Sequence, residues 1–363
     1  MKIAIIAPLV TAIREPQRGG SQSFVADLAT GLGSRGHEVH VYASSGSDIP
    51  GVRLIDTGVD PGSLAASLYR AGGDPGDPWV AESAFANVYQ RVREISYDLV
   101  HNHAFDAPAI SLAEAVGLPV VHTLHLPPDT NVVTALQQAA HHSTPPTVAT
   151  VSASQADAWR VFTQVHAILK PHVPTTRIPW SATAGHGVIF AGRLSPEKGV
   201  AEAIDIAKMA GMRIDVYGDP YDAEYAREQV DPRRVGPDVA VHSSVPRNRL
   251  WQIMARAAVV LCPVRWEEPF GMVAAEAQAC GTPVVAFRRG GLREVIVEGL
   301  TGFLVTPDDI PAAAAALHNV VEISRPQCRN HAETNLDLAQ SLIAHEQLYR
   351  RVTGATVPAA VDG

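Results

Sequence analysis

Short apolar runs alternate with amphipathic stretches along the whole chain, and loops rich in Gly and Pro separate them. An apolar run of about four to eight residues bounded by turn residues is typical of a buried strand. Runs of this kind predict strands at residues 2–7, 38–43, 98–103, 119–125, 147–152, 187–191, 213–217, 239–245, 259–263 and 283–287. Because helical patterns lie between these runs, we expect an α/β protein with parallel sheets.

The helical stretches carry apolar residues three and four positions apart, which is the spacing of one buried helix face. Ser21 is placed to cap the first helix, whose predicted buried face is Phe24, Val25, Leu28, Ala29 and Leu32. Further helices are predicted at residues 79–94, 200–210 and 272–280. Residues 58–78 are dense in Gly, Pro and Asp and predict an irregular loop beside a short helix, and residues 355–363 predict a frayed end.

A chain of 363 residues is long enough for two domains. Residues 170–187 contain three prolines and little periodicity, so we place the interdomain linker there. The predicted domains are residues 1–178 and 187–334, with 147–152 as the closing strand of the first and a further amphipathic helix at 335–353.

One stretch combines a strand, an acidic loop, a helix, a second strand and a glycine loop. The strand at 259–263 leads to Glu268, the helix at 272–280 contains Glu276, and the strand at 283–287 runs into Gly290-Gly291. Open α/β sheets bind ligands at the carboxyl ends of their strands, and exposed amides at a helix start favour an anion. This unit therefore suits a ligand with hydroxylated ends and a phosphate middle; the alternative is a solvated Glu pair before an ordinary helix.

Two other loops could contact the same anion. Gly19-Gly20 follows the first strand, where backbone can approach a phosphate, although a flexible turn explains it equally well. Arg193 and Lys198 lie before the helix at 200–210, and two cations beside a helix start suit a diphosphate, the alternative being a solvated charged loop. The match to G-x-G-x-x-G at residues 31–36 follows a helix and precedes a strand, which is the wrong context for a dinucleotide site.

Four histidines stand at or near the ends of two predicted strands. His101 and His103 end one strand, and His122 and His125 end the next. Histidine in such a position can hydrogen-bond hydroxyl groups, but single histidines are more often structural.

Composition narrows the function classes. A formal net charge of −8 argues against nucleic acid as a partner, and no apolar stretch has the length of a membrane span. The three cysteines form no Cys-x-x-Cys pair and suit buried positions in a reducing compartment, so we expect a cytoplasmic protein. No Asp-x-Asp pair is present to bind a metal ion, so we expect neither a metal nor a cofactor.

The acidic unit resembles the E-x7-E motif of the retaining glycosyltransferases of family 4. Glu268-Pro-Phe-Gly leads to Glu276, and the resemblance continues through residues 279–286 and 290–305 and through Gly192-Arg193-Leu with Lys198-Gly199. The resemblance implies the GT-B fold, two Rossmann-like domains with a cleft between them, and a helix at 335–353 that crosses back to the first domain. One departure is Ile178-Pro-Trp-Ser-Ala182, which stands where family members usually carry an Asn-Gly-Val-Asp turn.

The resemblance also implies roles for individual residues. Glu268 and the amides of Phe270 and Gly271 would hold sugar hydroxyls, Glu276 would hold the ribose, and Arg193 and Lys198 would hold the leaving diphosphate. His125 would lie beside the anomeric centre of the transferred sugar. Other implied donor contacts are Gly19, Gly20, Val245 and Val273, and the implied acceptor-cleft residues are His101, His103 and Asp106.

The expected function is retaining, metal-independent transfer from a nucleotide-diphosphate sugar, with UDP favoured, to a soluble acceptor such as a small metabolite or antibiotic precursor. Neither half of the chain is basic, which disfavours docking on a lipid surface. The alternatives are a lipid or polysaccharide acceptor, a nucleotide-sugar epimerase or phosphorylase on the same scaffold, an NAD-dependent oxidoreductase, and a binding module without activity. The acceptor, the sugar and the oligomeric state stay open.

Overall fold

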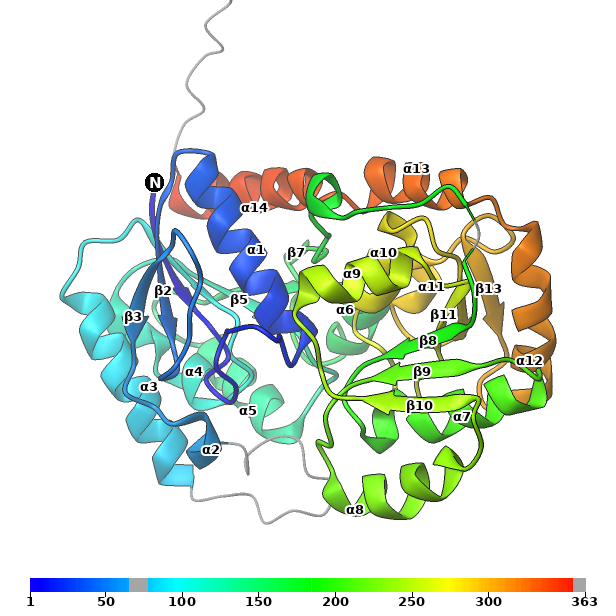
Figure 1. The fold of residues 1–363 in the computed structure, drawn as a ribbon. Helices are drawn as coiled ribbons and strands as arrows, with labels where there is room; N and C mark the ends of the chain where they lie inside the picture. The colour runs from blue at the N-terminus through cyan, green and yellow to red at the C-terminus, as the bar shows by residue number, and fades with distance from the viewer. Residues whose placement is uncertain (65–77, 184, 355–363) are drawn as a thin grey trace, which may run out of the picture. The chain divides into compact units, whose positions relative to one another are not determined.

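A computed structural model describes residues 1–64, 78–183 and 185–354, so the predictions for 65–77 and 355–363 lie outside the described residues. The chain divides into two compact units (Figure 1). The N-terminal unit contains Met1–Arg14, Ser21–Lys170 and the chain from Ala339 onward. The C-terminal unit contains Pro171–Leu338 and the short segment Glu15–Gly20.

The N-terminal unit is built on one parallel sheet with the strand order β3-β2-β1-β4-β5-β6-β7. Its strands are β1 (Lys2–Ile6), β2 (Glu38–Ala43), β3 (Arg53–Asp56), β4 (Leu99–Asn102), β5 (Val120–Leu124), β6 (Thr147–Thr150) and β7 (Ala167–Ile168). Its helices are α1 (Gly20–Ser34), α2 (Pro61–Leu64), α3 (Pro78–Arg93), α4 (Pro108–Ser111), α5 (Thr130–Ala139), α6 (Ala153–Trp159) and α14 (Leu338–Thr353).

Buried side chains on both sides of this sheet explain why its strands read as continuous apolar runs. Ala4 and Ile6 of β1 pack with Phe85 and Val88 of α3 in one cluster, and Ile3 and Ile5 are also fully buried. Parallel strands covered on both faces have this pattern. The prediction that residues 147–152 close the sheet is wrong, because β7 pairs with β6 beyond it. A strand of two residues gives too short an apolar run to be recognised.

The C-terminal unit repeats the arrangement with the order β10-β9-β8-β11-β12-β13, again all parallel. Its strands are β8 (Val188–Ala191), β9 (Ile214–Tyr217), β10 (Val239–His242), β11 (Val259–Cys262), β12 (Val284–Phe287) and β13 (Gly302–Val305). Its helices are α7 (Val200–Met209), α8 (Ala223–Tyr225), α9 (Arg247–Ala255), α10 (Met272–Ala279), α11 (Leu292–Val295), α12 (Ile310–Asn319) and α13 (Arg325–Asn335).

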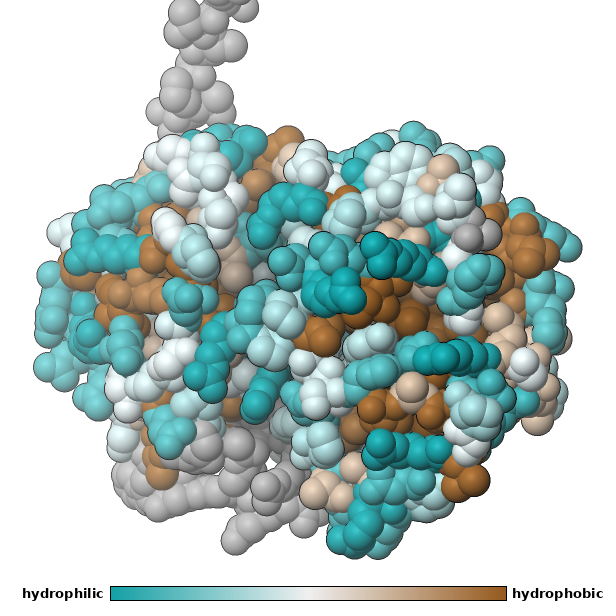
Figure 2. All heavy atoms as spheres, in the orientation of Figure 1, coloured by the Kyte–Doolittle hydropathy of each residue, from teal (hydrophilic) through white to brown (hydrophobic). Residues whose placement is uncertain are grey.

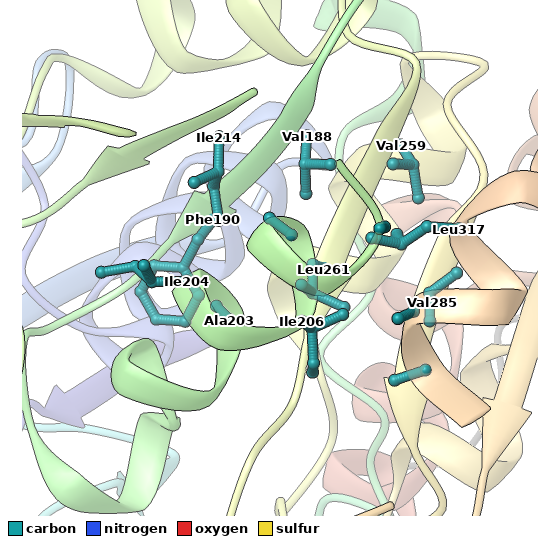
Figure 3. Packing of buried hydrophobic residues seen from close by; sticks show 14 of the residues in the cluster. Val188, Phe190, Ala203, Ile204, Ile206, Ile214, Val259, Leu261, Val285 and Leu317 are labelled. Atoms are coloured by element: carbon teal, nitrogen blue, oxygen red, sulfur yellow. The ribbon is translucent and has the colours of Figure 1, made fainter. Parts of the chain in front are cut away.

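The core of the C-terminal unit lies between this sheet and the helices α7 and α12. Val188 and Phe190 of β8, Leu261 of β11 and Ile204 of α7 are among its members, all 5% exposed or less (Figure 3). Alternate residues of each strand face the opposite side, where α9 and α10 lie against one another. In both units the first strand is central and the order reverses beside it, which is the doubly wound arrangement that places ligand sites at the strand carboxyl ends.

The starts of α6 and α1 differ in how they are capped. Ser152 caps α6, with its hydroxyl accepting a hydrogen bond from the amide of Gln155. The prediction that Ser21 caps α1 is wrong: α1 already begins at Gly20, and the Ser21 hydroxyl donates to the side chain of Gln22. The predicted buried face of α1 is confirmed in full.

The last described helix belongs to the N-terminal unit, although the chain reaches it through the C-terminal unit. Glu346 of α14 accepts two hydrogen bonds from Arg35, and the Tyr349 hydroxyl is hydrogen-bonded to Nδ1 of the buried His101. The Arg35 guanidinium is the main reason that the pKa of Glu346 falls to about 2. On the face shown in Figure 2, hydrophilic side chains are spread over both units. Among the described residues, no helix is both long enough and apolar enough to cross a lipid bilayer.

Candidate functional site

Lys198 and Glu268, two of the predicted site residues, form a direct ion pair in the C-terminal unit. The Lys198 Nζ donates to the Glu268 Oε2 at 2.7 Å, and the two side chains are only 22% and 13% exposed. Lys198 follows the carboxyl end of β8 and Glu268 follows that of β11, and these strands are neighbours in the sheet. The sheet order therefore joins a cation and a carboxylate that are 70 residues apart.

Trp266 completes this pair and was not predicted. Its indole Nε1 donates to the same Glu268 oxygen at 2.7 Å, and the Lys198 ammonium lies 4.9 Å from the centre of its ring. A cation over an aromatic face gains electrostatic attraction, so the tryptophan holds both partners. Its position two residues before Glu268 in the same loop was the available signal.

A close backbone approach holds the two loops together. Gly199 has φ +71° and lies so near the carbonyl of Pro263 that an added Cβ would be 2.0 Å from that oxygen. The amide of Arg265 also donates to the carbonyl of Glu197 at 2.9 Å. The Lys198-Gly199 pair thus has a physical reason: the glycine allows the contact that brings the lysine to the acidic loop.

Arg193 lies at the start of the same loop, beside polar and aromatic partners. Its guanidinium donates to Glu197 at 3.1 Å and stacks over Tyr221, with 4.6 Å between the guanidinium carbon and the ring centre. Its side chain is 21% exposed, so it is partly accessible to solvent.

The start of α10 provides backbone donors next to the acidic loop. Gly271 precedes the helix with φ +105°, a conformation that favours glycine, and no side chain caps this end. The amide of Ala275 is the first that bonds within the helix, to the Gly271 carbonyl, so the preceding amides, including that of Val273, are not used there. Phe270 is buried at 3% exposure and anchors the turn. Uncapped amides of this kind are suited to binding an anion.

The glycine loop after β12 fixes the acidic loop from the other side. The amide of Gly290 donates to the Glu267 carboxylate, and the amide of Gly291 donates to the carbonyl of Glu268, both at 2.7 Å. The predicted strand–acidic loop–helix–strand–glycine loop is therefore one connected structure.

The Glu276 carboxylate is buried and paired with an arginine, a contact that the sequence did not predict. Arg247 at the start of α9 donates from Nε to Glu276 Oε1 at 2.5 Å, and the two side chains are 10% and 6% exposed. The guanidinium also stacks on Trp251, 4.9 Å from the ring centre. The sequence analysis included Val245 of the preceding loop among the implied donor contacts but not Arg247, although a cation that opens a helix after a strand was a usable signal.

The remaining predicted donor contacts are Val245, in the loop before α9, and Gly19-Gly20, where α1 begins. Val245 is half-buried between β10 and α9. Gly19 and Gly20 group with the C-terminal unit, and a Cβ added to Gly20 would lie 3.1 Å from Cγ of Met272, the first residue of α10. The Gly19-Gly20 backbone thus lies near the same helix start.

The N-terminal unit contains a separate group of buried histidines. His103 Nδ1 and His125 Nε2 are 2.8 Å apart, and the rings of His101 and His103 are centred 4.0 Å apart. Burial is the main cause that lowers the pKa of His125, to about 3, and burial also lowers the pKa of His101 and His103. These imidazoles are therefore neutral at physiological pH.

Three histidines of this part of the sheet are almost completely buried. His101 is fully buried, with one nitrogen bonded to Tyr349 and the other to Thr123, so the prediction that it lines an acceptor cleft is wrong. His122 faces Asn102 within the sheet at 3.0 Å, which matches the structural alternative. His103 is also fully buried, so in the described structure it does not face an acceptor cleft.

His125 is 7% exposed and forms part of the wall of a small, mostly apolar pocket. The other walls are Ala104, Phe105, Leu124, Leu126, Pro127, Asp129, Val132 and Trp159. Asp106 directly follows Phe105 of this lining, before α4, and is 3% exposed. Among the described residues, no group of three or more His, Cys, Asp and Glu side chains is arranged to hold a metal ion.

Comparison with known proteins decides the family. Residues 18–169 match the family model described as Glycosyltransferase Family 4, and residues 184–335 match the one described as Glycosyl transferases group 1. The chain is a GT-B glycosyltransferase of the family 4 type. This confirms the predicted fold class of two Rossmann-like domains and the predicted enzyme class, a hexosyltransferase type of glycosyl transfer.

Individual relatives show how far the similarity extends. The glycosyltransferase is 27% identical over 352 residues to a glycogen synthase of Mycobacterium tuberculosis, covering 84% of this chain and 83% of that protein. It is 28% identical over 352 residues to a D-inositol 3-phosphate glycosyltransferase of Arthrobacter, with the same coverage of 84% and 83%. Its fold matches that of Anabaena HepE in complex with UDP-glucose, with a TM-score of 0.73 and 21% identity over 98% of this chain and 100% of that one.

Proposed function

We propose that this glycosyltransferase moves a sugar from a nucleoside diphosphate, with UDP favoured, to a hydroxyl group of a soluble acceptor, with retention of the anomeric configuration. The observation that carries this proposal is the Lys198–Glu268 pair beside the uncapped start of α10. The phosphate of a sugar phosphate is bound by cations and free backbone amides, and its sugar hydroxyls can donate to a carboxylate.

The donor contacts follow from this geometry. The diphosphate binds at the amides of α10 and of Gly19-Gly20, with Arg193 and Lys198 as its cations. Glu268 exchanges part of its contact with Lys198 for sugar hydroxyls, helped by the amides of Phe270 and Gly271. Glu276, held in place by Arg247, binds the ribose from one turn further along the helix, with Val245 and Val273 nearer the nucleoside.

The proposed chemistry takes place on one face of the sugar. The bond between the anomeric carbon and the phosphate oxygen breaks while the acceptor oxygen bonds to the same carbon. The acceptor proton passes to the departing phosphate oxygen, so no protein carboxylate is needed as nucleophile or base. Negative charge grows on the leaving diphosphate, and preorganised cations and amides stabilise that charge most in the transition state.

The donor and acceptor classes rest on similarity and on charge. The structure of HepE with UDP-glucose supports a UDP-sugar. An inositol-phosphate glycosyltransferase among the relatives supports a small soluble acceptor, while a glycogen synthase supports the alternative of a polysaccharide. The acidic N-terminal half gives little attraction to an anionic lipid surface, so a lipid acceptor is the less favoured alternative. A cytoplasmic location and independence from metals and cofactors belong to the same proposal.

The proposal can be tested with a panel of UDP-, GDP- and ADP-sugars, first alone and then with hydroxylated acceptors, with products identified by mass spectrometry. Transfer that requires an acceptor supports the proposal. Isomerised donor formed without an acceptor, or phosphate-dependent cleavage, would instead favour an epimerase or phosphorylase.

The same assay has a matched pair of variants. Lys198→Met removes the cation at the ion pair, whereas Lys208→Met removes an exposed lysine of α7. Loss of transfer in the first variant alone supports the assigned site, and equal activity in both contradicts it.

A further inference from the structure

The contact between His103 and His125 restricts where the protons of both rings can lie. The two nitrogens, His103 Nδ1 and His125 Nε2, are 2.8 Å apart, which is hydrogen-bond distance. Both rings are held neutral by burial, so each carries one N–H. Only one of the two facing nitrogens can therefore carry a proton, and the other must accept it.

The far side of His103 decides between the two arrangements. Its Nε2 is fully buried, and among the described residues no hydrogen-bond partner lies within reach of it. If His103 carried its proton there, a buried N–H would have no acceptor, and orphaned buried N–H groups are rarer than orphaned acceptors. The arrangement with the proton on His103 Nδ1, donating to His125 Nε2, avoids this.

This arrangement also fixes the tautomer of His125. Its Nε2 accepts the hydrogen bond, and a neutral imidazole carries its single proton on the other nitrogen, so the proton of His125 is on Nδ1. Aromatic neighbours hold both rings: Phe105 lies edge-on to His125 with ring centres 6.0 Å apart, and Phe24 lies edge-on to His103 at 6.2 Å. The pair is therefore fixed in orientation as well as in tautomer.

We propose that His103 is a positioning residue that holds His125 as the Nδ1–H tautomer, so that His125 presents a hydrogen-bond donor to the substrate. This inference rests on the proposed function and on the position that the resemblance to family 4 implies for His125, beside the transferred sugar. A ring that already carries a proton on its free nitrogen donates to an oxygen of the sugar or acceptor and cannot remove a proton there. The assignment thus agrees with a reaction in which the departing phosphate takes the acceptor proton.

The tautomer can be observed directly by NMR of protein labelled with ¹⁵N at histidine, using the long-range couplings that distinguish protonated from unprotonated ring nitrogens. In His103→Asn the side-chain amide can donate from nearly the position of the imidazole Nδ1, whereas His103→Leu removes the donor. His40→Asn is the control, because His40 is another buried histidine of this unit, bonded to Tyr97 and Glu38. Circular dichroism and thermal unfolding establish that each variant is folded.

We expect His125 to be protonated on Nδ1 in the wild type, in His103→Asn and in His40→Asn, and to lose this fixed tautomer in His103→Leu. We expect kcat to fall roughly 10- to 100-fold in His103→Leu, the usual effect of removing a residue that orients an imidazole, and to recover most of its value in His103→Asn. The donor KM should stay near that of the wild type in both.

Two results would overturn the inference. One is a wild-type His125 protonated on Nε2, whatever the activity. The other is a folded His103→Leu variant with wild-type kcat, which would remove the positioning role while leaving the glycosyltransferase assignment intact. A wild-type protein that transfers no sugar from any donor would count against the proposed function, but the NMR spectrum would still test the tautomer.

Discussion

Lys198 and Glu268 form an ion pair at 2.7 Å. The proposed cation for the diphosphate and the proposed carboxylate for the sugar are therefore bound to one another in the described structure. A donor that binds here must separate them or bridge them. Each side chain then exchanges a charged partner of the protein for a group of the ligand. In the proposed function, donor binding and sugar transfer are therefore coupled through this ion pair.

The first prediction follows from that coupling. Lys198→Ala should lower kcat/KM about 10- to 100-fold, because a charge-assisted hydrogen bond is worth roughly 1.5–3 kcal/mol. The larger share should fall on kcat, since the leaving group gains charge in the transition state. Arg193→Ala should show the same trend in steady-state assays. Wild-type kcat/KM in both variants would exclude these residues from the diphosphate site.

The second prediction concerns divalent metals. The sequence has no Asp-x-Asp pair, and the proposed site neutralises the diphosphate with side chains and amides. Transfer should therefore continue after exhaustive chelation and dialysis, with initial rates measured by nucleotide release. A strict requirement for Mg²⁺ or Mn²⁺ in the chemical step would contradict the proposed mechanism.

The third prediction separates the two glutamates and the stereochemistry. The product should keep the anomeric configuration of the donor, as read from the anomeric proton by NMR. Glu268→Gln should mainly lower kcat, because its contact lies beside the reacting carbon, whereas Glu276→Gln should mainly raise the donor KM. An inverted product would remove the retaining mechanism altogether.

Because Glu276 is paired with the buried Arg247, the two glutamates can also be compared by their effect on stability. Glu276→Gln removes one charge of a buried ion pair and should lower the melting temperature, since an uncompensated buried charge is destabilising. Glu268, which is more exposed, should show a smaller change when substituted in the same way. Equal melting temperatures in the two variants would show that the Arg247 contact contributes little.

A fourth prediction concerns pH. Burial lowers the pKa of His122 and His125 to about 3, below the ordinary value of 6.5 that they regain when unfolded. The unfolded chain therefore binds more protons between these values, and the free energy of unfolding should fall as pH drops from about 6.5 toward 3. Each such histidine contributes a slope of up to about 1.4 kcal/mol per pH unit.

Urea unfolding measured across this pH range tests the prediction, and His122→Asn should make the slope shallower. Below about pH 4.5 the unfolded chain also takes up a proton at Glu346, whose folded pKa is about 2, so stability should fall further in the same direction. A stability that stays constant from neutral pH to pH 4.5 would mean that the histidines are not held neutral in the folded protein.

A fifth prediction addresses Arg325, which α13 buries in the C-terminal unit. Its guanidinium donates to the carbonyls of Ser181, Ala257 and Ala255 and to the Thr282 hydroxyl. Arg325→Met should destabilise this unit by at least about 2 kcal/mol, because several buried acceptors lose their donor. Arg256→Met, which removes an exposed arginine after α9, is the control for the loss of charge.

The sequence predicted the elements better than it predicted the partners of side chains. Strand positions were recognisable because parallel strands buried on both faces have continuous apolar runs, and α10 because Gly271 and Gly281 bound it. The two-residue β7 and the start of α1 gave no comparable signal. Arg247 was missed as the partner of Glu276 because that contact depends on how α9 and α10 pack, which local periodicity does not contain. Trp266 lies two residues from Glu268, but its contact with Lys198 depends on β8 and β11 being neighbours.

The return of α14 to the N-terminal unit has a consequence for biosynthesis. Arg35 and His101 obtain their partners Glu346 and Tyr349 only after the ribosome has added roughly 180 further residues beyond Lys170. Domains usually fold as they emerge, in order from the N-terminus. Here the first sheet can form early, but its last covering helix arrives after the whole second sheet has been made. A nascent chain that stops after the first sheet and before α14 would expose the surface around His101 that α14 covers. That surface would then be accessible to chaperones.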